Sequence, residues 1–193
     1  TPDDITVSCQ DFNSTPPSLD YSNNETGDCL ISGSVNGTLV GSAQPCGGDV
    51  QYMWTFTDEC ARTIEYSQTV TVEPAPEPEF LNPPADITVS CSDVPPIGTL
   101  NFSNGATGAC GIGGQIAGFQ TGSYDECGGQ IVYNWSFTDQ CGTTITHSQM
   151  ITVEPASEPE WVNPPESTSI GCGEEFPDPL LLEYSNGESG PCS

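Results

Sequence analysis

The chain has 193 residues, with 27 acidic side chains against a single basic one, and its formal charge is -26. Nucleic acid and anionic membrane surfaces are excluded as partners, because both carry charge of the same sign. No stretch of about 18 apolar residues occurs, so direct membrane insertion is not expected either. Ten cysteines without a Cys-x-x-Cys pair predict disulfides and an oxidising extracellular compartment. The lack of an initiator Met and of a signal peptide indicates a processed piece of a longer protein.

Alternation of large and polar residues predicts five to seven short strands in the first part of the chain. The clearest is the stretch between Cys46 and Cys60, where Val, Tyr, Trp and Phe occupy every second position. No segment has a useful helical period. We therefore expect an all-β chain of antiparallel, immunoglobulin-like β-sandwiches. The predicted strands are Ile5–Cys9, Leu19–Ser22, Ser34–Val40, Val50–Thr57 and Thr63–Val72, with counterparts one repeat later.

The same pattern returns after about 81 residues, as shown by Cys29 and Cys110, which both end a Gly-x-Cys string. The repeat predicts two complete modules, residues 1–82 and 83–163, and the start of a third at 164–193. Linkers at about 73–84 and 154–165 are rich in Pro and Glu, which favours a stiff polyproline II spacer and an end-to-end arrangement. Each linker has one aromatic residue, Phe80 or Trp161, which either packs between consecutive modules or covers its own module's core.

The four cysteines of each complete module are predicted to staple that module internally. A strand of about eight residues spans roughly 26 Å, whereas bridged Cα atoms lie within about 7 Å, so Cys46 cannot reach Cys60. If each strand reverses the chain, the first and third cysteines share one end of the sandwich and the second and fourth share the other. Cys172 and Cys192 are then left without partners. The predicted pairs are Cys9–Cys46, Cys29–Cys60, Cys91–Cys127 and Cys110–Cys141.

Carboxylates that recur at turns and linkers offer calcium as a further interpretation, because a hard cation prefers oxygen ligands. The chain has no D-x-D-x-D-G string, however, and Asp58 and Asp139 equally fit turns in which they accept backbone N–H groups. No cofactor is required. The candidate calcium ligands are Asp4, Asp58, Asp86 and Asp139, with the linker residues Glu73, Glu77, Glu79, Glu154, Glu158 and Glu160.

No catalytic site is predicted. His147 is the only histidine, and no Ser-His-Asp or Cys-His pair can be assembled in both modules. His147 occupies the position of Tyr66 in the other module and shares a strand face with Ile145 and Ile151, which indicates a packing or sheet-edge role. We therefore do not expect an enzyme.

The Asp-Ile-Thr-Val-Ser-Cys strings that end at Cys9 and Cys91, and the Phe-Thr-Asp-x-Cys turns at Cys60 and Cys141, resemble the hyalin-repeat (HYR) family. The four-cysteine form is most similar to HYR-like modules of giant surface adhesins of Bacteroidota, including gliding adhesins. Ala61 stands where the family usually has Gly after the fourth cysteine. The resemblance implies an immunoglobulin-like fold, export to the cell surface, and a role in adhesion or gliding.

Two functions follow as hypotheses. The first is a stalk or filament segment of a long secreted surface adhesin, whose partners are the neighbouring modules of the same chain. The second is a ligand-binding module, in which turn loops at Gly33–Gly41 and Gly111–Gly122 contact a glycan or a protein, because these loops differ between modules more than the strands do.

Overall fold

The computed structural model describes all 193 residues and contains strands and short 3-10 turns but no α-helix, which confirms the all-β prediction. None of its helical turns has the length or apolar character needed to cross a lipid bilayer. The chain forms two compact units that interleave along the sequence. Unit 1 comprises Thr1–Asn82, Leu100–Ile116 and Ser136–Ile145, and unit 2 comprises Pro83–Thr99, Ala117–Trp135 and Thr146–Ser193.

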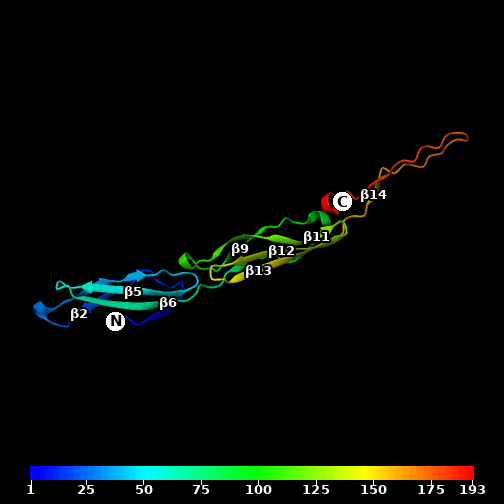
Figure 1. Ribbon diagram of the computed structural model, residues 1–193. Coiled ribbons are helices and arrows are strands. Elements are labelled where there is room, and N and C mark those ends of the chain that lie inside the picture. Colours follow the sequence, from blue (N-terminus) through cyan, green and yellow to red (C-terminus); the bar gives the residue numbers. More distant parts are fainter. The chain divides into compact units, whose positions relative to one another are not determined.

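The main sheet of unit 1 has the strand order β1-β6-β5-β4, and its two long strands β5 and β6 run side by side in Figure 1. Its centre is a hairpin of two ten-residue strands whose ends meet at the pair Thr57↔Thr63. The alternation in β5 buries Val50, Tyr52 and Trp54, which form the core with Val70 and Val72 of β6. The bounds are β1 Ile5–Val7, β4 Thr38–Val40, β5 Gly48–Thr57 and β6 Thr63–Val72.

A second layer covers this core. The strands β2 (Ser18–Ser22) and β3 (Ser32–Asn36) pair antiparallel, and Tyr21 of β2 stacks on Phe56 of β5 with ring centroids 3.9 Å apart. The Trp54 indole N–H donates to the Pro17 carbonyl at 2.8 Å. This aromatic contact and this hydrogen bond join the two layers into an immunoglobulin-like all-β fold.

Unit 1 also holds a three-stranded sheet of order β10-β9-β7. Its edge strand β7 comes from the first linker and pairs antiparallel with β9, with Phe80 opposite Phe102. Phe102 in turn stacks on Phe137 at 3.9 Å, so the linker strand completes the layer over the tip of the second long hairpin. The bounds are β7 Glu79–Leu81, β9 Thr99–Ser103 and β10 Gly113–Ala117.

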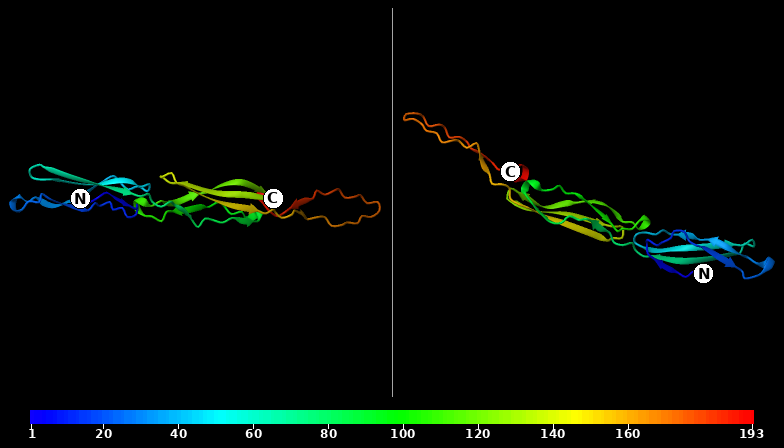
Figure 2. Two further views of the ribbon diagram at one scale, coloured as in Figure 1. Left: turned by 90° about the horizontal axis from the view of Figure 1, so that it is seen from below. Right: turned by 180° about the vertical axis from the view of Figure 1, so that it is seen from behind.

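Unit 2 repeats the architecture of the main sheet with the strand order β11-β12-β13-β8. Ile131, Tyr133 and Trp135 of β12 and Ile151 and Val153 of β13 are buried, as in the first hairpin. A short antiparallel pair, β14 with β15, flanks an extended and largely exposed loop at residues 163–182, orange to red in Figure 2. The bounds are β8 Ile87–Val89, β11 Phe119–Asp125, β12 Gly128–Thr138, β13 Thr144–Val153, β14 Glu160–Val162 and β15 Glu183–Ser185.

The predicted strands are confirmed, with Ser34–Val40 divided into β3 and β4. One feature of the antiparallel prediction is wrong, because β1 pairs parallel to β6, with Ile5 opposite Val70, and β8 pairs parallel to β13. A parallel pair requires a long crossover, and β2 to β5 supply it here. The end-to-end arrangement and the module boundaries 1–82, 83–163 and 164–193 stay predictions.

Candidate functional site: disulfides between repeats

Three disulfides are present, and each joins one repeat to the next. In Cys9–Cys110 and in Cys91–Cys192 the first cysteine of a repeat bonds the second cysteine of the following one, with Cα atoms 5.8 Å apart in both. In Cys46–Cys141 the third cysteine of a repeat bonds the fourth of the next, with Cα atoms 5.3 Å apart. All three bonds obey one register, and none closes a loop within a single repeat.

This register replaces the predicted internal pairs Cys9–Cys46, Cys29–Cys60, Cys91–Cys127 and Cys110–Cys141, none of which forms. The first and third cysteines of the first repeat do lie at one end, as alternating strand directions predict: the Cys9 Sγ is 3.8 Å from the carbonyl oxygen of Gln44, close in sequence to Cys46. The error was the assumption that cysteines at one end must bond each other. Cys192 is bonded, contrary to prediction, whereas Cys172 is unpaired as expected.

The second cysteine of each repeat is held by the Asn of a Tyr/Phe-Ser-Asn string. The Asn104 side chain donates to the carbonyl of Cys110 at 2.9 Å and accepts the N–H of Ile112 at 3.0 Å. Asn186 donates in the same way to the carbonyl of Cys192 at 2.6 Å. The Tyr/Phe-Ser-Asn string recurs in the sequence with its Asn six residues before the cysteine. This constant spacing is the signal that could have identified the contact between the Asn side chain and the cysteine carbonyl.

Cys9–Cys110 is part of the hydrophobic core of unit 1, where both cysteines are 4% exposed and pack with Val50 and Trp54. Cys46–Cys141 is exposed on the surface instead. The two bonds between the first and second repeats therefore lie in different environments.

Backbone geometry presents Cys46 and Cys141 for bonding. Gly47, directly after Cys46, has a φ of +73°, and a Cβ there would lie 2.6 Å from the Val72 carbonyl oxygen, so only glycine fits. Cys141 lies in the turn between β12 and β13, where one oxygen of Asp139 accepts the N–H groups of Cys141 and Thr143, each at 2.8 Å.

The four aspartates among the candidate calcium ligands each accept a backbone N–H. Asp58 Oδ1 accepts from Cys60 and Arg62 at 2.9 Å, as Asp139 does in the equivalent turn, which confirms the turn interpretation of both residues. Asp4 and Asp86 accept the N–H of Thr69 and of Met150, each at 2.7 Å, and so brace the sheet edge. No group of three or more His, Cys, Asp or Glu side chains converges as a metal site would require.

The ionisable groups in these turns and cores respond to their surroundings. The backbone N–H of Arg62, followed by the guanidinium that lies 2.7 Å away, holds the pKa of Asp58 below its usual value. The same contact raises the pKa of Arg62. Burial raises the pKa values of Tyr52 and Tyr133, whose hydroxyls donate to carbonyls of the preceding loops.

His147 has the predicted packing role. Its ring stacks on Trp135 with centroids 5.8 Å apart, and Nε2 lies 2.9 Å from the Pro84 carbonyl oxygen. Tyr66 takes the same place against Trp54 at 6.0 Å, with its hydroxyl donating to the Pro2 carbonyl.

The linker aromatics both lie on strands that pair with the repeat that follows them. Phe80 on β7 is opposite Phe102, and Trp161 on β14 is opposite Tyr184, with which it makes an edge contact at 6.3 Å. Trp161 remains 60% exposed. Packing of these residues between modules stays a prediction.

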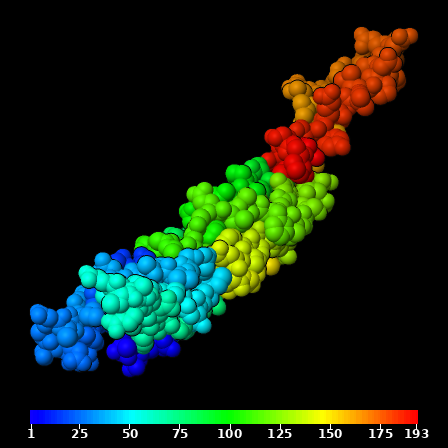
Figure 3. Space-filling model, turned by 60° about the vertical axis from the view of Figure 1, so that its left-hand side comes forward, coloured from blue at the N-terminus to red at the C-terminus, as the bar shows by residue number.

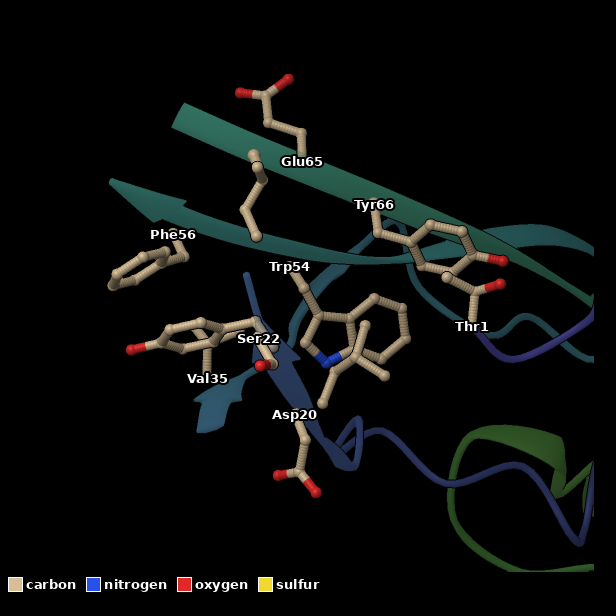
Figure 4. A pocket seen from close by; sticks show the side chains of 11 residues that line it. Thr1, Asp20, Ser22, Val35, Trp54, Phe56, Glu65 and Tyr66 are labelled. Atoms are coloured by element: carbon tan, nitrogen blue, oxygen red, sulfur yellow. The ribbon is translucent and has the colours of Figure 1, made fainter. Parts of the chain in front are cut away.

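Unit 1 has an open cleft of about 290 Å³ between β2 and the β5–β6 hairpin. Trp54 and Phe56 extend from β5 toward the β2 side, while the carboxylates of Asp20 and Glu65 point away from each other (Figure 4). A second cleft continues past Tyr21 to Arg62 and Asp58. The linings combine aromatic and aliphatic side chains with hydroxyl, carboxylate and guanidinium groups.

The comparisons agree with this picture. Residues 80–153 match the family described as an HYR-like domain with four cysteines. No curated protein matches the chain significantly. The match begins within the linker strand β7, which the structure places in the sheet of the second repeat. Residues 80–153 are therefore similar to an HYR-like domain with four cysteines, an extracellular, adhesion-type repeat module, and the disulfides fit an oxidising compartment.

Proposed function

We propose that this chain is a stalk segment of a long, secreted surface adhesin, in which disulfides between consecutive repeats limit extension. The observation that carries the proposal is the register of the bonds Cys9–Cys110, Cys46–Cys141 and Cys91–Cys192. A disulfide inside one module stabilises only that module. A disulfide between modules also fixes their spacing, which is what a mechanical spacer needs.

The covalent paths through the chain explain how strongly extension is limited. The shortest path runs from Thr1 to Cys9, across to Cys110, back along the chain to Cys91, and across to Cys192. This path holds roughly 30 residues and spans on the order of 100 Å when extended, against about 650 Å for the whole chain at about 3.4 Å per residue. Unfolding under tension therefore releases little length while the disulfides are intact.

Composition supports the same function. The charge of -26 keeps neighbouring chains apart and soluble, and the Pro-rich linkers favour an end-to-end arrangement of modules. Resemblance to HYR-like modules of Bacteroidota adhesins supports attachment at a cell surface and a role in adhesion or gliding. The segment works without catalysis and needs no cofactor, because hydrogen bonds within the turns already use the recurring aspartates.

Single-molecule force spectroscopy tests this proposal on the whole chain, pulled from its two ends with and without reductant. The total contour length of the fully extended oxidised chain should be about a sixth of that of the reduced chain. The matched variant Cys9→Ser with Cys110→Ser should recover an intermediate length. Equal contour lengths in the two redox states would contradict a tension-bearing role.

Ligand binding through the segments 33–41 and 111–122 is the alternative outcome. Much of both segments lies in strands β3, β4, β10 and β11, whose backbone groups pair within sheets. A glycan array probed with the oxidised chain should show no specific binding. Saturable binding that is lost on substitution within these segments would instead assign the ligand-binding function.

A further inference from the structure

The four unpaired cysteines, Cys29, Cys60, Cys127 and Cys172, are all exposed. Under the register of the three bonds, the second and fourth cysteines of a repeat bond the first and third cysteines of the repeat before it. Cys29 is the second cysteine of the first repeat, and Cys60 is its fourth. Cys127 is the third cysteine of the second repeat, and Cys172 is the first of the third. The register therefore pairs each unpaired cysteine with a cysteine that is not among the ten of this sequence.

We propose that Cys29, Cys60 and the open edge of β2 form a receiving site for another HYR-like repeat, which joins through two disulfides and one added strand. This inference rests on the proposed stalk function and identifies its partner. We call residues 19–30 and 58–62 the free receiving end. Residues 100–111 and 139–143, the same elements one repeat later, are the engaged receiving end.

The engaged receiving end shows what the site binds. There Cys110 is 4% exposed and Phe102 is 6% exposed, whereas their counterparts Cys29 and Tyr21 are exposed and half-buried respectively. The Asn104 side chain donates to Pro76 of the preceding linker at 3.2 Å as well as to Cys110. The segment around residues 20–35 protrudes uncovered from unit 1, blue in Figure 3.

The free receiving end is already shaped for bonding. Asn23 holds the carbonyl of Cys29 at 2.8 Å, as Asn104 holds that of Cys110 at 2.9 Å. Asp58 accepts the N–H of Cys60 at 2.9 Å, as Asp139 accepts that of Cys141 at 2.8 Å. Both cysteines are therefore presented in the conformation that bonds elsewhere in the chain.

The edge of β2 has room for the added strand. β9 lies between β10 and β7, and β15 pairs with β14, but β2 pairs with β3 alone. The first linker strand, β7, places Phe80 opposite Phe102, and the second, β14, places Trp161 opposite Tyr184. The same register puts an aromatic residue opposite Tyr21, beside the clefts that run along β2.

Charge complementarity favours a linker strand of this kind. Both linker strands begin with a glutamate, which stands opposite Ser103 in β9 and Ser185 in β15. The equivalent position in β2 is Ser22, which lines a cleft together with Arg62, the chain's only basic side chain. An acidic linker strand would therefore lie beside the chain's only basic side chain, which also pairs with Asp58 at 2.7 Å.

Formation of each bond is an oxidation of two thiols. Two electrons and two protons pass to a disulfide-donating oxidant of the extracellular compartment, which is released as a dithiol. One thiolate attacks the oxidant to give a mixed disulfide, and the partner cysteine displaces it.

The experiment duplicates residues 1–82 in front of the complete chain, so that the added copy supplies Cys9, Cys46 and the linker strand containing Phe80. Thiols are alkylated without reduction, and the disulfides are mapped by mass spectrometry. Cys29 and Cys60 of the original module should lose labelling and be recovered bonded to Cys9 and Cys46 of the added copy. Continued labelling, or a Cys29–Cys60 bond, would overturn the inference.

Two controls separate this inference from the stalk function. Cys9→Ser in the added copy should restore labelling of the original Cys29 and leave Cys60 bonded. The Cys9–Cys110 bond of the original module reports the stalk register independently: if it forms while Cys29 stays labelled, only the inference fails, and if it is missing from the unmodified chain, the stalk function fails.

A second measurement avoids dependence on the folding of the duplicated chain. The same disulfide map of the protein isolated from its natural surface, alkylated during extraction, should show Cys29 and Cys60 in disulfides with first and third cysteines of HYR-like repeats. Recovery of either as a free thiol would refute the site.

Discussion

The two receiving ends have nearly the same local structure but differ in burial. Each consists of a strand, a 3-10 turn of three residues ending in a cysteine, and a hairpin turn closed by an aspartate. The engaged end buries Phe102 and Cys110, while the free end leaves Cys29 exposed. Local sequence thus sets the conformation, and the preceding repeat sets the burial, so stability in this chain is shared between neighbours.

Removal of the buried disulfide should have the largest effect. The double variant Cys9→Ser with Cys110→Ser opens a loop of 101 residues, and the chain-entropy model gives a loss of about 4.7 kcal/mol in the free energy of unfolding. Guanidinium unfolding followed by Trp fluorescence measures this. Hydrogen exchange at residues 106–111 should rise toward that at residues 25–30, and Cys29→Ser should change stability by less than about 0.5 kcal/mol.

The second largest difference between the two receiving ends should appear when the equivalent aromatic residues, Phe102 and Tyr21, are each replaced by Ala and the free energies of unfolding are compared. Phe102→Ala removes a ring that stacks on Phe137 and faces Phe80, and should cost about 3 kcal/mol. Tyr21→Ala removes a less buried ring and should cost about half as much. In the chain with duplicated residues 1–82, the cost of Tyr21→Ala should rise toward that of Phe102→Ala, and an unchanged cost would argue against strand addition at β2.

Substitutions in the two hairpin turns should change the free energy of unfolding by a smaller amount. Ala61 has a φ of +61° at the position where Gly142 has +84°, so the turn keeps its shape despite the substitution that distinguishes the first repeat. Ala61→Gly should therefore stabilise unit 1 by about 1 kcal/mol, and Gly142→Ala should destabilise it similarly. Thermal unfolding of the two variants checks the sign of each change.

The smallest expected effect is on the pH dependence of stability in acid. The Arg62 N–H and guanidinium lower the pKa of Asp58 in the folded state, so its contribution to stability is present above the unfolded pKa of about 3.9. That contribution is lost as the pH falls through the lower folded pKa. Asp58→Asn should reduce the acid dependence of unfolding, measured between neutral pH and about pH 2, and a steeper dependence would be inconsistent with the shift.

The sequence predicted the strands and turns because their signals are local. Alternation marks β5, and the glycines and aspartates mark its ends. The disulfide register could not be predicted in this way, because the repeat of about 81 residues gives each module a second cysteine in the same local sequence, as at Cys29 and Cys110. Spacing alone therefore does not distinguish Cys29 from Cys110 as the partner of Cys9. The parallel pairing of β1 with β6 was missed for a related reason, since it depends on a crossover and not on local pattern.

The overlapping disulfides also protect the chain against cleavage. Cys9–Cys110 bridges every peptide bond from Cys9 to Cys110, and Cys91–Cys192 bridges those from Cys91 to Cys192. A protease that cuts once anywhere between Cys9 and Cys192, including the exposed Pro-rich linkers, leaves both fragments attached. In the proposed stalk, a single nick in this region would therefore leave the parts on either side of the cut covalently joined.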